Sequence, residues 1–164
     1  MSGKDYLRLL LYFVLLLLCF SIQNTAGLLP EFFGAAPLLT AAFAYAAAVY
    51  DNIYISAATA AAAGVLTEVT LGGVIGPCTI LLVLAGVLAG AVSRRLDSSA
   101  LFAVLGGGLY SFVICAGVYF SGAVQSGVVP GLPELLSAAA LRGAYTWIWC
   151  IIICLFFKDQ NKGR

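Results

Sequence analysis

Histidine is absent from this 164-residue chain, and charged residues make up only 9% of it. The missing histidine removes the commonest general base and the commonest metal ligand. The low charge excludes an ordinary soluble domain, in which about a quarter of the residues are charged. The net charge of +1 is too small to indicate nucleic-acid binding.

The cysteines do not occur in a Cys-x-x-Cys pair, and no aqueous loop carries them. All five lie in apolar runs: Cys19, Cys78, Cys115, Cys150 and Cys154. We interpret them as small packing residues without a disulfide or metal role. No nucleophile–base pair, phosphate-binding loop or metal-ligand cluster is evident, so we expect no cofactor and no enzymatic activity.

Apolar residues dominate the composition. They make up 63% of the chain, and the mean hydropathy is +1.07. We therefore predict an all-α, polytopic membrane protein that forms a single transmembrane domain over residues 1–164. The expected helices are 6–23, 37–50, 53–69, 71–92, 100–121 and 141–157, with an exposed Gly- and Pro-rich loop between the last two.

The distribution of basic residues decides how often the chain crosses the membrane. With six spans and the N-terminus inside, the Arg94-Arg95 pair and the basic C-terminal cluster lie on the same, cytoplasmic side. Only Arg142 then lies outside. If residues 37–69 formed one span, the two basic clusters would lie on opposite sides, against the positive-inside tendency. Six spans with both termini cytoplasmic is the prediction.

Residues 64–95 contain the most informative pattern in the chain. Glu68 lies in an apolar passage, where a carboxylate at the bilayer centre costs about 2.5 to 3.5 kcal/mol. It either faces a partner or cavity, or has a structural role near the outer end of the third span, where it is solvated or caps the next helix, and the sequence leaves these open. Glycines four residues apart permit close helix packing. The candidate partner or helix-packing residues are Gly64, Glu68, Gly72, Gly76, Pro77, Gly86 and Gly90.

Three segments carry a resemblance to a known family. The first predicted helix ends in Gln23-Asn24-Thr25, and Pro37-Leu38-Leu39 begins the second. Gly64-Val65-Leu66-Thr67-Glu68 is followed by Gly72-Gly73-Val74-Ile75-Gly76. Together they resemble the MreD family, the small membrane subunit of the bacterial rod-shape system (the elongasome). The family usually has aspartate where this chain has Glu68, so the acidic position is similar but not identical.

The resemblance implies a non-enzymatic scaffold in the bacterial cytoplasmic (inner) membrane that supports peptidoglycan synthesis. Its implied partners are a bitopic MreC-type protein and, through it, the MreB filament and the RodA-transpeptidase synthase. The resemblance also implies a bundle related to the S-component fold of energy-coupling-factor transporters.

An S component that binds a vitamin for such a transporter is the alternative. That family has a comparable length and six spans with cytoplasmic termini. Its first helix commonly carries an A-x-x-x-A patch that docks the coupling subunit. Here the first helix reads LLLYFVLLLLCF and is bulky throughout. Polar loop residues that could hold a vitamin are also few.

The six-span topology can be tested with reporter fusions at Ser99 and at Gln125. The fifth predicted span separates these positions, so the two reporters should indicate opposite sides of the membrane. Reporters that indicate the same side would contradict the six-span model.

Overall fold

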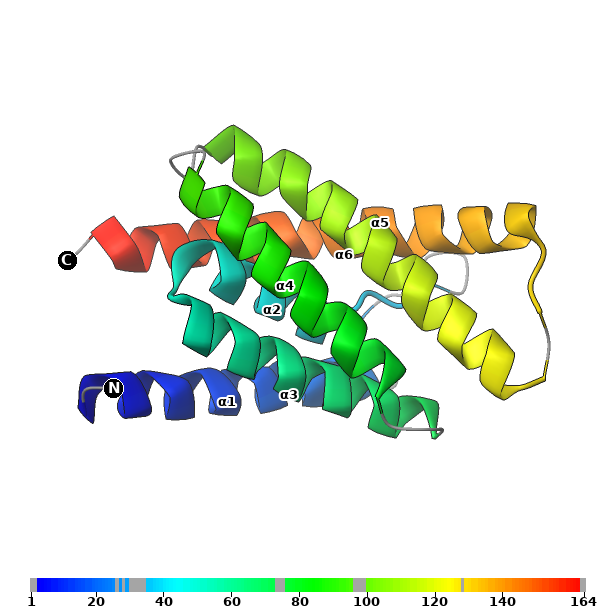
Figure 1. Cartoon of the computed structure of the whole chain (residues 1–164), viewed down its shortest axis with the longest axis horizontal. Coiled ribbons are helices and arrows are strands. Elements are labelled where there is room, and N and C mark those ends of the chain that lie inside the picture. The colour runs from blue at the N-terminus through cyan, green and yellow to red at the C-terminus, as the bar shows by residue number, and fades with distance from the viewer. Residues whose placement is uncertain are drawn as a thin grey trace.

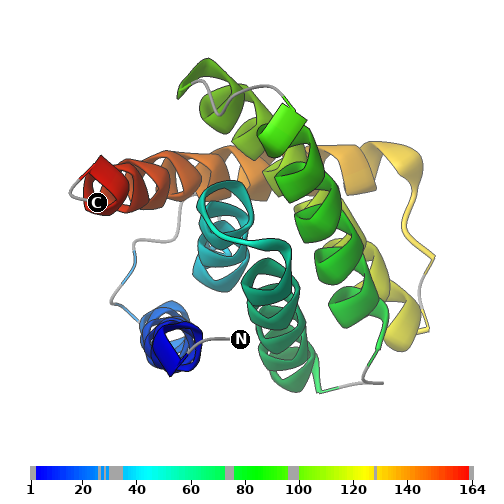
Figure 2. The same cartoon turned by 60° about the vertical axis from the view of Figure 1, so that its left-hand side comes forward.

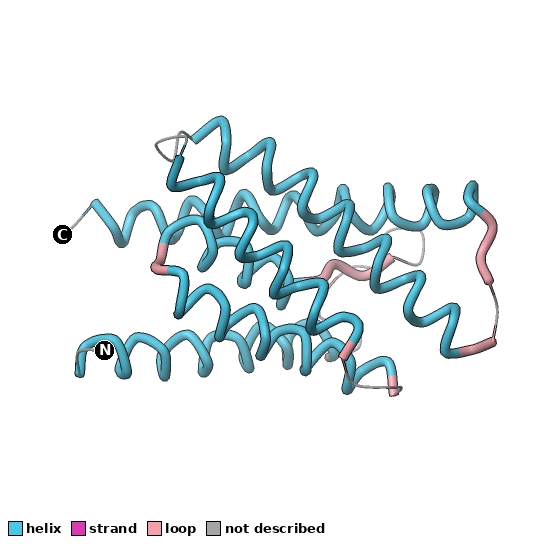
Figure 3. The backbone as a smooth tube through the Cα atoms, viewed as in Figure 1, coloured by secondary structure: helices cyan, strands magenta, loops and turns pink. Residues whose placement is uncertain are grey.

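The computed structural model describes residues 3–25, 27, 29, 35–72, 76–95, 100–127 and 129–162. Every regular element in these ranges is a helix, and most connections between helices are short (Figure 3). The helices are α1 (Gly3–Asn24), α2 (Leu39–Tyr50), α3 (Ile53–Leu71), α4 (Pro77–Arg95), α5 (Ala100–Gln125) and α6 (Leu132–Lys162). The expectation of an all-helical chain is confirmed.

Five of these helices are long and apolar enough to cross a membrane, and α2 is the exception. With 12 residues, α2 rises about 18 Å, well short of a hydrocarbon core of about 30 Å. The predicted second span, 37–50, is thus not a full transmembrane helix. The non-helical residues 36–38 precede it and can add at most about 10 Å, so helix and extended residues together barely reach the thickness of the core.

Helix α2 occupies the centre of the bundle (Figure 2). It contacts all five other helices, and all its residues before Tyr50 are buried. A helix that is apolar all round belongs in an interior, and the alanines of LTAAFAYAAAVY let five neighbours approach closely. Its buried tyrosine, Tyr45, donates its hydroxyl to the Ala103 carbonyl oxygen of α5 at 3.1 Å.

Both termini lie at the same end of the bundle (Figure 1), together with the turn between α2 and α3. Asp51 in this turn accepts a hydrogen bond from the Tyr12 hydroxyl at 2.8 Å and pairs with Arg8 at 3.5 Å. Arg94 of α4 donates to the Asp51 carbonyl oxygen at 3.3 Å. The turn therefore ties α1 and α4 to the central helix. We call this the Asp51 end of the bundle.

The boundaries of α2, α4 and α6 correct the sequence prediction. Helix α2 begins at Leu39 rather than residue 37. Helix α4 begins at Pro77 rather than residue 71, because Gly72, in the left-handed conformation (φ 67°), ends α3. Proline suits a first helical position, where its missing N–H costs nothing.

Helix α6 begins at Leu132 rather than residue 141, which shortens the predicted loop. Its first turn contains Pro133, and Glu134 accepts a hydrogen bond from the Gly131 N–H at 3.4 Å. These starting signals lie in the Gly- and Pro-rich segment that the sequence analysis assigned to a loop. Alanine and leucine then continue the helix.

Two glycines allow α4 to lie close to α2 and α3. A Cβ atom at Gly86 would lie 3.3 Å from the Ala60 Cβ of α3, and one at Gly90 would lie 2.8 Å from the Ala48 carbonyl oxygen of α2. The second distance is too short for a real carbon atom beside backbone. Glycine at position 90 is therefore required by the close approach of α4 to α2.

We predict that Gly90→Ala lowers the free energy of unfolding in detergent by about 1 to 3 kcal/mol, as overpacking does elsewhere. Gly122→Ala in α5 is the matched control, because its Cβ would meet Leu71 at an ordinary 3.7 Å. Thermal unfolding of both variants measures the difference. Equal stability of the two variants would show that α4 does not approach α2 as closely as described.

Candidate functional site

Glu68 lies one turn before the end of α3 and is 1% exposed. Its carboxylate faces the first turn of α4. Oε1 accepts hydrogen bonds from the backbone N–H groups of Cys78 at 2.6 Å and Thr79 at 3.1 Å, and Oε2 accepts one from the Thr79 hydroxyl at 2.6 Å. A side chain on one helix thus caps the start of the next.

The energetics of this cap offset the cost of burying the charge. The first N–H groups of a helix have no partner within the helix, and they carry its positive dipole end. Hydrogen bonds to a charged group contribute about 1.5 to 3 kcal/mol each. Three of them match or exceed the roughly 2.5 to 3.5 kcal/mol that a carboxylate costs at the membrane centre.

The backbone around Glu68 is shaped by glycine and proline. A Cβ atom at Gly64 would overlap the Cα atom of Thr79, so α3 and α4 approach closely beside the carboxylate. Gly72 and Gly76 have positive φ angles of 67° and 142°, and Pro77 begins α4. These four residues and Glu68 form one hairpin, whereas Gly86 and Gly90 lie farther along α4. Residues 73–75, part of the family-like segment, lie outside the described residues.

Both Glu68 oxygens are therefore engaged within the chain. A contact with a partner would need a free carboxylate oxygen, and the described contacts leave neither oxygen free. The contacts favour the cap, which fixes the angle between α3 and α4.

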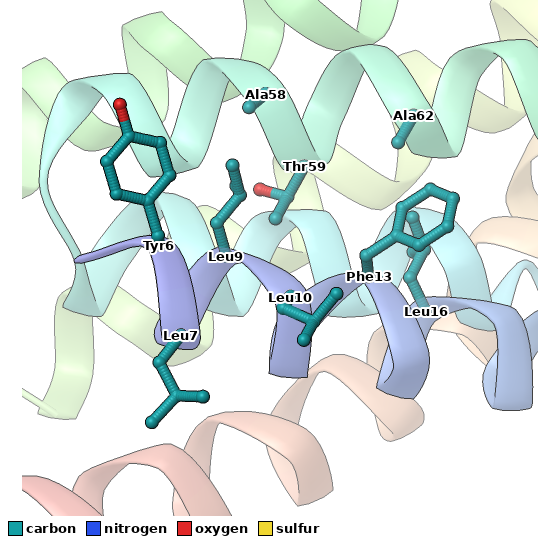
Figure 4. Close-up of a pocket in the computed structure, with 9 residues that line it drawn as sticks. All are labelled: Tyr6, Leu7, Leu9, Leu10, Phe13, Leu16, Ala58, Thr59 and Ala62. Carbon is teal, nitrogen blue, oxygen red and sulfur yellow. The ribbon is translucent and has the colours of Figure 1, made fainter. Parts of the chain in front are cut away.

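An apolar groove runs between α1 and α3 (Figure 4), and we call it the α1–α3 groove. Its volume is about 700 Å³. Bulky residues of α1 form one wall, where Leu9 extends toward Thr59 of α3, and two alanines contribute to the other wall. The lining residues are Tyr6, Leu7, Leu9, Leu10, Phe13, Leu16, Ala58, Thr59 and Ala62. Most of α1 is exposed, so this helix is attached to the bundle along a narrow contact.

A smaller, polar cavity lies at the end of the bundle opposite the Asp51 end, and we call it the Arg142 cavity. Its volume is about 240 Å³, and it is lined by Gln23, Asn24, Ala36, Leu38, Thr67, Thr70, Leu71, Val118 and Arg142. The sequence analysis did not find it, because the lining comes from four helices and the segment before α2. The available signal was Arg142, the one basic residue placed on the outer side.

The described cysteines and carboxylates do not cluster as metal ligands would. No group of three or more His, Cys, Asp or Glu residues lies close enough there to hold a metal ion. The cysteines are free thiols, and Cys19 alone among them is not fully buried.

No family model matches the chain, and neither does any curated protein or any solved structure. The class of the protein therefore follows from its own structure. It is a helical bundle with several helices suited to crossing a membrane, as in a multi-pass membrane protein.

Replacement of Glu68 tests whether this residue stabilises the protein through its hydrogen bonds or only by filling space. Glu68→Gln keeps a carbonyl oxygen for the Cys78 and Thr79 N–H groups, so we expect a small loss of stability. Glu68→Leu leaves both N–H groups unpaired, at about 1 to 3 kcal/mol each. Thermal unfolding in detergent should rank wild type above Gln and Gln well above Leu.

Glu134→Leu is the control, because Glu134 is exposed at the start of α6. Its exposed hydrogen bond to the Gly131 N–H helps to start α6, so its loss should cost about 1 kcal/mol or less. A Glu68→Leu variant as stable as this control would contradict the cap.

Proposed function

We propose that this chain is a non-enzymatic membrane scaffold of the rod elongation machinery in the bacterial cytoplasmic membrane. The observation that carries the proposal is the α1–α3 groove, and the MreD-like segments described above support it. The proposed partner is an MreC-type protein with one transmembrane helix. Through that partner the scaffold reaches the MreB filament and the RodA-transpeptidase synthase, and so supports peptidoglycan synthesis.

The groove has the chemistry that a single transmembrane helix requires. Its lining is almost entirely apolar, so it suits a helix in hydrocarbon rather than a soluble ligand. Ala58 and Ala62 are four residues apart on α3, a spacing that lets two helix backbones approach closely. The exposed leucines of α1 offer a second apolar wall. A bitopic partner would supply one helix to this one groove.

The proposed orientation follows from charge. Arg8, Arg94 and Arg95 lie at or near the Asp51 end, where both termini also lie (Figure 1). The positive-inside tendency assigns that end to the cytoplasm. A scaffold so oriented presents its termini on the side where an MreB filament assembles.

The runner-up function is a vitamin-binding S component, and the six helices with both termini at one end are compatible with it. We propose the S-component-like arrangement as the architecture in either case. The bulky first helix favours the scaffold, because it lacks the small patch that would dock a coupling subunit.

A bulky side chain in the α1–α3 groove tests whether the partner binds there. Ala58→Trp places a large ring in the α1–α3 groove, whereas Ala91→Trp places the same ring at an exposed alanine of α4. We expect Ala58→Trp to weaken co-purification of a co-expressed MreC-type partner by roughly tenfold or more, equivalent to about 1.4 kcal/mol. Ala91→Trp should leave it unchanged.

Vitamin uptake measured on the same variants separates the two functions. Uptake by the wild type without partner binding would contradict the scaffold. Undiminished partner binding by a folded Ala58→Trp variant would exclude the groove as the docking site.

A further inference from the structure

The proposed scaffold function does not use the Arg142 cavity, which combines polar and apolar lining residues at one end of the bundle. Side chains from α1, α3 and α6 converge on it: Gln23, Asn24, Thr67, Thr70 and Arg142. Apolar side chains, among them Leu38 and Val118, complete its wall. A few convergent polar groups in an otherwise apolar pocket are the general pattern of a small-molecule site.

One side of the cavity holds uncommitted hydrogen-bond donors. The guanidinium of Arg142 has five N–H groups, and its Nε–H donates to the Ala36 carbonyl oxygen at 2.9 Å. The remaining four N–H groups have no acceptor among the described residues. The Gln23 side-chain oxygen accepts hydrogen bonds from the Thr40 N–H and hydroxyl. The Gln23 amide NH₂ has no acceptor in the part of the chain that the structure describes.

The other side holds acceptors. The hydroxyls of Thr67 and Thr70 donate to carbonyl oxygens of α3, at 2.8 and 2.6 Å, and so retain their lone pairs. The Asn24 amide nitrogen donates to the Phe20 carbonyl oxygen at 2.9 Å, which leaves its own oxygen as an acceptor. A ligand that fits both sides carries a negative group and hydroxyl groups.

The positive charge of Arg142 is not neutralised by a described carboxylate. Arg8 and Asp51 form the one ion pair among the described residues, at the opposite end of the bundle. Both oxygens of Glu68 bind the start of α4. Among the described residues no carboxylate is paired with Arg142, and an anion bound in the cavity would supply that counter-charge.

We propose that the Arg142 cavity binds a small hydroxylated anion, a phosphate or carboxylate of about the size of a glycerol phosphate group. At about 240 Å³ the cavity is smaller than the roughly 300 to 1,000 Å³ of sites for drug-sized ligands, so a small group fits. The planar fork of arginine binds two oxygens of such a group at once. The ligand is either a lipid headgroup or a free solute, because the cavity lies where α1 and α3 end.

Two probes distinguish these sources with the purified full chain. Glycerol 3-phosphate, with glycerol as its neutral control, is added in detergent, and binding is measured by calorimetry and by the rise in unfolding temperature. For phosphatidylglycerol, with phosphatidylcholine as control, native mass spectrometry measures how much lipid stays bound to the protein. We expect binding of at least one probe, and Arg142→Gln should weaken it by roughly tenfold or more, since charge-assisted bonds are lost.

Two further variants make the test decisive. Thr70→Trp, at an exposed lining residue, should obstruct the cavity while leaving Arg142 in place. If Arg142→Gln does not fold, Thr70→Trp tests binding in its stead. Arg95→Gln removes an exposed positive charge at the last residue of α4, far from the cavity, and should bind as wild type does. Binding of neither probe to wild type would overturn the proposal. So would undiminished binding to a folded Arg142→Gln or Thr70→Trp variant.

Discussion

The structure depends on one constraint, that polar backbone groups at helix starts must find partners where water is scarce. Two helices begin against other helices of this bundle, and each is capped by side chains from elsewhere in the chain. Glu68 of α3 binds the first N–H groups of α4. Thr146 of α6 accepts from the Leu38 N–H at 3.1 Å, and Gln23 of α1 accepts from the Thr40 N–H. Each cap also fixes the position of one helix against another, so a local hydrogen-bonding requirement determines the arrangement of the bundle.

The overall helical class was accessible from the sequence because it follows from composition and apolar run length. The Gly64 and Glu68 pattern also indicated a special contact, since glycine permits close approach of helices and a carboxylate is costly in such a run. Their actual partner, the first turn of α4, depends on a backbone approach that no spacing rule supplies. The start of α4 was wrong because Gly72 and Pro77 were included in one helix, whereas Gly72 ends α3 and Pro77 begins α4. The start of α6 was wrong because the Gly- and Pro-rich segment before residue 141 was assigned to a loop, whereas it contains the helix start.

The Arg142 cavity could not be predicted from the sequence for a different reason. Gln23, Thr67 and Arg142 are far apart along the chain, and each has an ordinary explanation on its own. Only the packing of α1, α3 and α6 brings them to one space. A short second helix at 37–50 was predicted, but its burial among all five other helices was not, because that burial depends on how the bundle packs.

The half-length of α2 has a consequence for biogenesis. Residues 36–50 leave the ribosome well before α6, yet the backbone N–H of Leu38 and the carbonyl of Ala36 are paired by Thr146 and Arg142 of α6. The helix is too short to span the bilayer alone, and these two backbone groups beside it gain their side-chain partners only from the last helix. The centre of the molecule is therefore complete only when α6 packs against it, although α2 is the second helix to be synthesised.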